Sequence, residues 1–198
     1  MTASTDRARV LVADEAARII LDEGVKDYQL AKHKAAARLG FTSRRALPRN
    51  TEIERAVLSR RALFDAETHD LHLRELRQTA LQAMQLFENF NPRLVGSVLK
   101  GTAGARSNIN LHLFADTVED VIFLLTDANI PYQSKEKRLR LNGAALYYPA
   151  LEFMADKVEI EAVIMPPDNI RQAPLCPIDG RPMRRATLTE VKGLVGAS

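Results

Sequence analysis

Hydrophobic residues recur at three- and four-residue steps through the first 90 positions of the chain, which is the spacing of amphipathic helices. Asp27 is placed to cap the start of one such helix, and Gly24 and Gly40 are placed to end two of them. A polar connector, residues 41–50, separates the second helix from the third. The pattern predicts four helices, over residues 8–23, 28–39, a stretch from Asn50 or Thr51 onward, and about 68–90.

The pattern changes after Pro92, where short apolar runs and alternating residues replace the helical period. Five of the nine prolines then lie between Pro166 and Pro182, which predicts an irregular arm followed by a short helix over residues 187–194. We therefore predict an α+β fold: a helical basic N-terminal region (1–90), a small mixed sheet with a flanking helix (91–166), and a Pro-rich arm with a C-terminal helix (167–198). The predicted strands cover residues 93–99, 108–114, 137–141, 146–154 and 158–166, with a helix over 118–128 and an Asn-Gly hairpin turn at 142–143.

Composition is that of a globular chain, with 46% hydrophobic and 27% charged residues among 198. No apolar run approaches the ~20 residues that span a bilayer, and Asp14, Glu15 and Arg18 interrupt the N-terminal apolar stretch, so we expect neither a membrane segment nor a secretory signal. Cys176 is the only cysteine, which excludes an internal disulfide and a cysteine-cluster zinc site. The expected location is the cytoplasm.

Positive charge is concentrated in residues 26–61, which carry 10 basic and 3 acidic side chains. Such a segment favours phosphate-bearing partners, although solvated helix faces explain the same pattern equally well. The ten-residue connector is too long for a helix-turn-helix, so we expect non-specific RNA contact rather than reading of a DNA sequence. The candidate nucleic-acid-binding residues are Lys32, Lys34, Arg38, Arg44, Arg45 and Arg49.

The stretch "VGSVLKGTAGARSNINL", residues 95–111, combines small residues with two asparagines at strand spacing. Gly96-Ser97 is predicted to present backbone N–H groups and a hydroxyl in a tight turn that a phosphate can approach. Asn108 and Asn110 would share one face of the next strand, because residues two apart in a strand point the same way. The stretch is neither a Walker A loop, since Lys100 precedes Gly101, nor a dinucleotide fingerprint, since no helix is expected after the glycines.

This stretch resembles the nucleotidyltransferase superfamily related to DNA polymerase beta, whose small members carry Gly-Ser, a glycine five residues after the first, and then Ser-Asp-x-Asp-Leu. Here Gly96-Ser97, Gly101 and Ser107-Asn108-Ile109-Asn110-Leu111 fall at those offsets, and "KVEIEAVI" brings Glu159 and Glu161 as candidates for the family's third carboxylate. The resemblance covers residues 92 to 165, and the whole chain is similar to bacterial proteins labelled nucleotidyltransferases. It implies an NTP or other nucleotide as ligand, with the Gly-Ser turn on its phosphates and Glu159 or Glu161 as catalytic carboxylates.

The departure from the family lies at the two metal-binding positions, where Asn108 and Asn110 replace aspartates. Mg²⁺ prefers anionic oxygen, and each lost charge forfeits about 4 kcal/mol at ~4 Å in an effective dielectric near 20. We therefore expect no certain cofactor and a nucleotidyltransferase-like protein with impaired catalysis, which binds a nucleotide or RNA end. Three alternatives stay open: an active transferase whose Mg²⁺ site is rebuilt on Glu159 and Glu161, an interaction module with a vestigial cleft, and a ligand-free glycine-rich hairpin.

Other side chains near the motif are candidates for phosphate or base contact. Lys100 and Arg106 bracket the glycine loop, and His112 shares the strand face of the two asparagines, where packing or solvation explains it equally well. The arm carries Arg181, Arg184 and Arg185, which we expect to fold back over the cleft. His69 and His72, three positions apart on a predicted helix, could share a face and bind a metal, but helix-surface histidines are more often solvated. Ser97 lacks the His-Asp pattern of a hydrolase triad, and Cys176 lacks an activating base.

Overall fold

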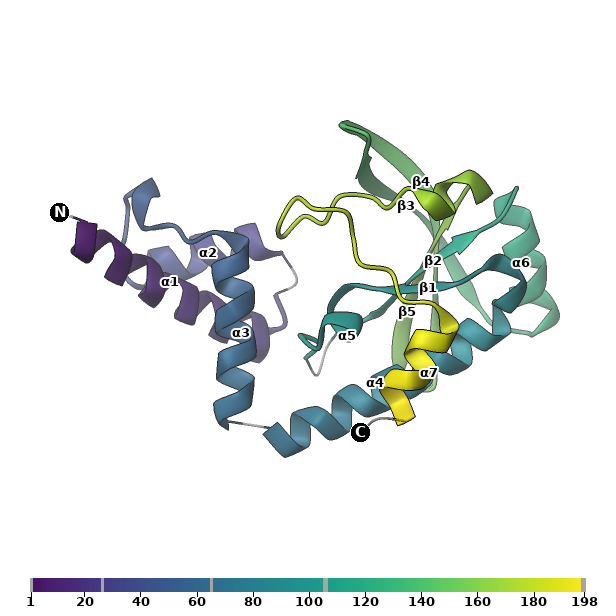
Figure 1. Ribbon diagram of the computed structural model, residues 1–198, viewed down its shortest axis with the longest axis horizontal. Helices are drawn as coiled ribbons and strands as arrows, with labels where there is room; N and C mark the ends of the chain where they lie inside the picture. Colours follow the sequence, from purple (N-terminus) through teal and green to yellow (C-terminus); the bar gives the residue numbers. More distant parts are fainter. Residues whose placement is uncertain (1, 26, 65, 105–106, 197–198) are drawn as a thin grey trace. The chain divides into compact units, whose positions relative to one another are not determined.

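The computed structural model describes residues 2–25, 27–64, 66–104 and 107–196, and places the helices before the sheet in an α+β arrangement (Figure 1). Contacts divide the chain into two units, the first built mainly from residues 1–70 and the second from 71–103, 108–176 and 180–198. The helices are α1 (Thr2–Glu23), α2 (Tyr28–Arg38), α3 (Asn50–Phe64), α4 (Ala66–Leu86), α5 (Gly96–Lys100), α6 (Val118–Asp127) and α7 (Leu188–Gly196). The strands are β1 (Arg93–Val95), β2 (Ile109–Phe114), β3 (Tyr132–Leu141), β4 (Ala144–Ala155) and β5 (Val158–Met165), and short 3-10 turns cover Arg44–Ala46, Glu88–Phe90 and Pro167–Arg171.

The first unit is a three-helix assembly of α1, α2 and α3 around a small apolar core. Alanines dominate the contact between α1 and α2, where Ala16, Ala31 and Ala35 are fully buried, and Ile53 and Val57 of α3 complete the core. Small side chains let the helix backbones approach closely, so a modest apolar surface suffices to hold the three helices together.

Asp27 begins α2 as predicted, because its carboxylate accepts hydrogen bonds from the backbone N–H groups of Gln29 and Leu30 at 2.7 and 3.4 Å. These are donors that a helix start would otherwise leave unpaired. The polar connector before α3 contains a single 3-10 turn whose Ala46 is buried. The starts of α2 and α3 therefore follow the sequence signals, whereas α1 begins at Thr2, six residues before the predicted start.

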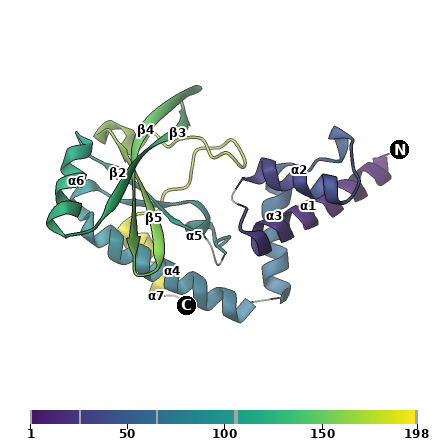
Figure 2. The ribbon, with the colours of Figure 1, turned by 180° about the vertical axis from the view of Figure 1, so that it is seen from behind.

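The second unit is a five-stranded mixed sheet in the order β1-β2-β5-β4-β3. Strands β2 and β5 are parallel neighbours, and every other neighbouring pair is antiparallel. Helices α4, α6 and α7 cover one face of the sheet (Figures 1 and 2), and Ile109, Leu111 and Leu113 of β2 are fully buried against them. Because side chains alternate along a strand, the intervening residues of β2 lie on the opposite face.

That opposite face, called here the open face, is partly covered by the arm that follows β5. A small apolar cluster there joins Phe114, Val163 and Met165 of the sheet to Ile170 and Met183 of the arm. The arm returns to the edge of the sheet, where Leu94 of β1 and Ala186 exchange two backbone hydrogen bonds of 2.9 Å. The arm is therefore irregular, as its prolines indicate, but it is tied down by backbone pairing and apolar packing.

The third strand, β3, begins at Tyr132 and not at residue 137 as predicted, and two further elements of the sheet unit differ from the sequence prediction. The predicted strand over residues 93–99 is instead a three-residue strand followed by the short helix α5, because Gly96 takes a left-handed φ of +78° and turns the chain at once. Helix α4 was expected within the helical region, whereas its apolar face from Leu73 to Phe87 packs in the core of the sheet unit. An apolar helix face needs a partner surface, and the sheet supplies it. No described helix is long and apolar enough to cross a membrane.

Candidate functional site

The Gly96-Ser97 turn lies directly beside Asn110. Residues 95 and 110 are partners in the pairing of β1 with β2, and a Cβ atom added to Gly96 would lie 3.2 Å from the Asn110 side-chain nitrogen. Gly96 therefore serves two needs, a left-handed backbone and close approach of the neighbouring asparagine. Gly101 ends α5 in the same left-handed region, with φ of +77°, and the Ser97 carbonyl accepts the backbone N–H of Thr102.

The two asparagines meet the two predicted catalytic carboxylates, because β2 and β5 are parallel neighbours in register. Asn110 is paired with Glu161, and the side-chain amide of Asn108 donates a hydrogen bond to a carboxylate oxygen of Glu159. The Asn110 amide also donates to the backbone carbonyl of Asn108 at 3.3 Å. The sheet thus brings Gly96, Asn108, Asn110, Glu159 and Glu161 together.

Two lysines of β3 form ion pairs with carboxylates of this face. Lys137 donates to both oxygens of Glu161 at 2.6 and 2.8 Å, and Lys135 donates to Glu152, which lies opposite Glu161 in the β4–β5 pairing. The described residues contain no group of three histidine, cysteine or acidic side chains arranged to hold a metal ion. With neutral amides at Asn108 and Asn110 and an ammonium on Glu161, these residues do not fit Mg²⁺.

His112 is the most deeply buried ionisable side chain near this site, with 2% of its surface exposed. Burial, with the charges of Arg185 and Lys137, lowers the pKa of its imidazole to about 4. Its Nδ1 atom is buried and has no hydrogen-bond partner among the described residues. The imidazole is therefore neutral at physiological pH, because a positive charge on it would be buried away from water and close to two other cations.

Arg185 reaches the open face from the arm, in line with the expectation that arm arginines fold back over the sheet. Its guanidinium lies 5.4 Å from the centroid of the Phe114 ring and donates to the backbone carbonyls of Asn169 and Ile170 at 3.0 and 2.7 Å. Its neighbours Arg181 and Arg184 are exposed. One of the three arginines thus becomes part of the site, and the other two face solvent.

The residues that bracket the glycine loop have different surroundings. Lys100 Nζ lies 3.5 Å from Cys176 Sγ, so the arm brings the buried thiol to the end of α5. The sequence gives no sign of this contact, because the two residues are 76 positions apart. Arg106 lies outside the described residues. Gly104 and Ser107 close the loop through a hydrogen bond of 2.8 Å from the Gly104 N–H to the Ser107 hydroxyl.

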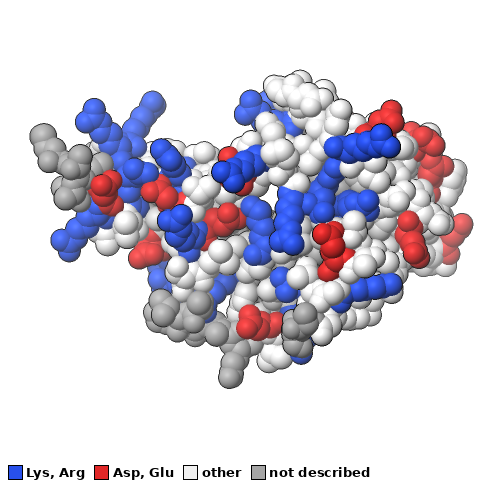
Figure 3. Space-filling model, in the orientation of Figure 1, with Lys and Arg blue, Asp and Glu red and all other residues white. Residues whose placement is uncertain are grey.

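The predicted nucleic-acid-binding residues fall into two sets within the first unit. Lys32 is buried and donates to the Pro48 carbonyl at 3.0 Å, while Lys34 and Arg38 are paired with Glu23. These pairings lower the pKa of Glu23 to about 2, chiefly through the Arg38 hydrogen bond and then that of Lys34. The residues of the connector are exposed: Arg44, Arg45 and Arg49. Figure 3 shows Lys and Arg interspersed with Asp and Glu over α1–α3, further Lys and Arg over the strands and arm, and acidic residues over α6.

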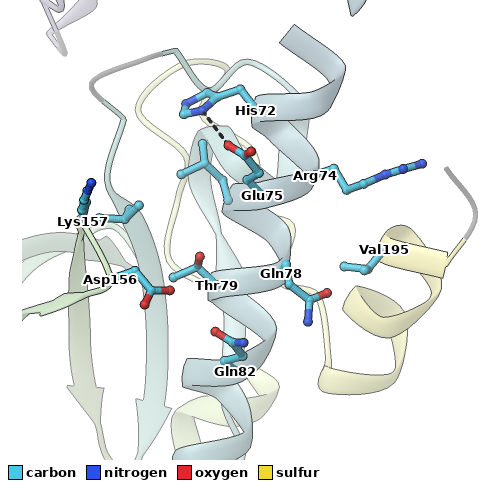
Figure 4. Close-up of a pocket in the computed structure, with 11 residues that line it drawn as sticks. His72, Arg74, Glu75, Gln78, Thr79, Gln82, Asp156, Lys157 and Val195 are labelled. Carbon is cyan, nitrogen blue, oxygen red and sulfur yellow. Dashed lines mark ion pairs between the residues drawn. The ribbon is translucent and has the colours of Figure 1, made fainter. Parts of the chain in front are cut away.

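A hollow lies on the helix-covered side of the sheet unit, away from the predicted site. It is an open groove of about 710 Å³ between α4, the β4–β5 turn and α7, and Figure 4 shows His72 and Glu75 of α4 across from Asp156 and Lys157. His72 lies 3.8 Å from Glu75, and His69 lies 2.7 Å from Arg61. None of the residues predicted from the motif lines this groove.

Four site residues escaped the sequence prediction or had no role in it: Lys135, Lys137, Glu152 and Cys176. Lys135 and Lys137 lie on the edge strand β3 and Glu152 lies on the neighbouring β4, so their shared face depends on the register of β3 against β4 and of β4 against β5. The alternation of charged residues in "QSKEKRLRL" gives the face of each lysine but not its partner.

Comparison of the chain with models of protein families, with curated proteins and with solved structures finds no match. The function is therefore argued from the site itself.

Proposed function

We propose that this protein is a nucleotidyltransferase-like nucleotide-binding protein with impaired catalysis, whose ligand is a nucleotide or an RNA end held at Gly96-Ser97 and the asparagine face. The observation that carries the proposal is the close approach of Asn110 to Gly96, the residue before Ser97, where an added Cβ atom would lie 3.2 Å from the Asn110 side-chain nitrogen. Neutral amides and a hydroxyl can bind phosphate oxygen or ribose hydroxyls by hydrogen bonding.

Cationic side chains of the sheet unit favour a phosphorylated ligand. Lys100 ends α5, Lys137 and Arg185 act electrostatically on His112, and all belong to the sheet unit. A phosphate bound here would be neutralised by side chains instead of by a metal ion. An active transferase that uses Glu159 and Glu161 is the less favoured function, because their carboxylates are already engaged by Asn108 and Lys137.

The proposal is tested by thermal unfolding and isothermal titration calorimetry of the full chain with each NTP, in EDTA and in Mg²⁺ or Mn²⁺, and with a short single-stranded RNA. We expect binding in EDTA, lost in Ser97→Ala and retained in Ser134→Ala, whose serine is exposed on β3. A response that requires metal would support the active transferase instead. No response to any nucleotide or RNA would refute the proposal and favour an interaction module.

A further inference from the structure

Three carboxylates share the open face of the sheet at its β4–β5 side. Glu152 and Glu161 lie directly opposite one another, and Glu159 is two residues from Glu161 on the same strand. Like charges opposite one another across two strands destabilise a sheet, so this arrangement requires a neighbouring cation. Carboxylate oxygen is the ligand that hard divalent cations prefer, so these side chains would attract a divalent ion if no other cation were present.

The cations present are side chains of the edge strand β3. Lys137 reaches across β4 and places its ammonium on both oxygens of Glu161, and Lys135 binds Glu152. The Glu161 side chain is only 14% exposed, so the ammonium meets it in a partly desolvated place. The pKa of Lys135 is raised by its hydrogen bond to Glu152 and further by the charges of Glu152, Glu159 and Glu161. All three carboxylates therefore act on the ammonium of Lys135.

We propose that the ammonium of Lys137 is a tethered cation that takes the place of a divalent metal ion in the candidate site, which makes ligand binding metal-independent. The proposal rests on the proposed function for its ligand, a nucleotide phosphate, but not for the competition between Lys137 and metal. A divalent ion would have to displace the ammonium from both oxygens of Glu161 before it could bind there. The asparagines give it no compensating charge, since their amide oxygens are neutral.

The proposal is tested by metal binding to the intact chain, measured with Mn²⁺ by electron paramagnetic resonance and calorimetry. Lys137→Met keeps the aliphatic stem and removes the cation, and Lys192→Met, at an exposed lysine of α7, is the matched control. We expect wild type and the control to bind Mn²⁺ weakly, Lys137→Met to bind about tenfold more tightly, and Lys137→Met with Asn110→Asp to gain about a further tenfold, since affinity follows the charge of the ligands.

A folded Lys137→Met protein with no gain in Mn²⁺ affinity, alone or with Asn110→Asp, would overturn the proposal. Circular dichroism checks folding, and Lys137→Gln, which retains a polar end, replaces Lys137→Met if the latter does not fold. The same standard then applies to Lys137→Gln.

Nucleotide binding gives a second, separate readout, with ATP as the probe. In EDTA, Lys137→Met should bind ATP at least about fivefold more weakly than wild type, and Mn²⁺ should restore the affinity in the variant alone, because a charge-assisted contact is lost and then replaced. If wild type binds ATP but the variant gains no Mn²⁺ affinity, the proposal that Lys137 replaces a metal ion is wrong and the proposed function stands. If wild type binds no nucleotide but the variant gains Mn²⁺ affinity, the proposed function is wrong and the tethered cation stands.

Discussion

The buried imidazole of His112 should make the stability of the sheet unit fall steeply in mild acid. Its pKa is lowered from 6.5 to about 4 in the folded chain, first by burial and then by Arg185 and Lys137. Between these two values the unfolded chain binds a proton at this residue and the folded chain does not. The free energy of unfolding therefore rises with pH through this window. The contribution of His112 is fully present above about pH 6.5 and is lost as the pH falls toward 4.

The magnitude follows from the same two values. The difference between 6.5 and about 4, at about 1.4 kcal/mol for each pH unit, gives a loss of about 3 kcal/mol across the whole window. At pH 5 the loss is about 2 kcal/mol, which is a large part of the ~5–15 kcal/mol that holds an ordinary domain folded. Because the side chain is 2% exposed, solvent screens this effect little.

The assay is urea unfolding at pH 7.5, 6, 5 and 4.5, followed by the near-ultraviolet circular dichroism of tyrosine, since three of the four tyrosines belong to the sheet unit. His112→Leu removes the titrating group, and His33→Leu, at an exposed histidine of α2, is the control. The free energy of unfolding of wild type minus that of His112→Leu should fall by about 2 kcal/mol between pH 7.5 and 5, because only wild type carries the titrating group. An unchanged difference, or a His112 imidazole that titrates near 6.5 by nuclear magnetic resonance, would refute the reasoning.

Two backbone devices give further predictions of stability, each with a matched control. Gly96→Ala should destabilise the sheet unit by about 1–2 kcal/mol in urea unfolding, through its φ of +78° and its contact with Asn110, whereas Gly193→Ala, in α7 with open space around it, should be neutral or stabilising. Asp27→Ala should cost about 1 kcal/mol by removing the N-cap of α2, measured as loss of helical ellipticity at lower urea, and Asp14→Ala, at an exposed position of α1, should change little. Equal effects in a variant and its control would contradict either explanation.

Helix positions were predictable because their signals are local. Asp27 caps α2 as its position before an apolar run indicates, and the Thr117–Asp120 capping box begins α6. The strand boundaries after Asn142-Gly143 and Asp156-Lys157 also follow local turn chemistry, with left-handed φ at Asn142 and Asp156. The strand predicted over residues 93–99 was wrong because a single left-handed glycine converts it into a strand and a short helix, a choice that neighbouring residues do not determine.

The candidate site was predictable only along single strands. The face shared by Asn110 and His112 follows from alternation, and that shared by Glu159 and Glu161 follows in the same way. Their meeting requires β2 and β5 to be parallel neighbours, and the lysine partners require the register of two further strand pairs. Register depends on the burial of whole strands, so no motif in the sequence could reveal the contact of Lys137 with Glu161.

The asparagines and the lysines of the open face form one electrostatic arrangement. An aspartate at position 110 would stand beside Glu161 in the β2–β5 register and would add a fourth negative charge to Glu152, Glu159 and Glu161. With the Lys137 ammonium in place, that added charge has no metal to offset it and should raise the free energy of the folded state. The single change Asn110→Asp should therefore destabilise the protein without creating a metal site, whereas removal of the Lys137 ammonium should open one and the added carboxylate should then strengthen it.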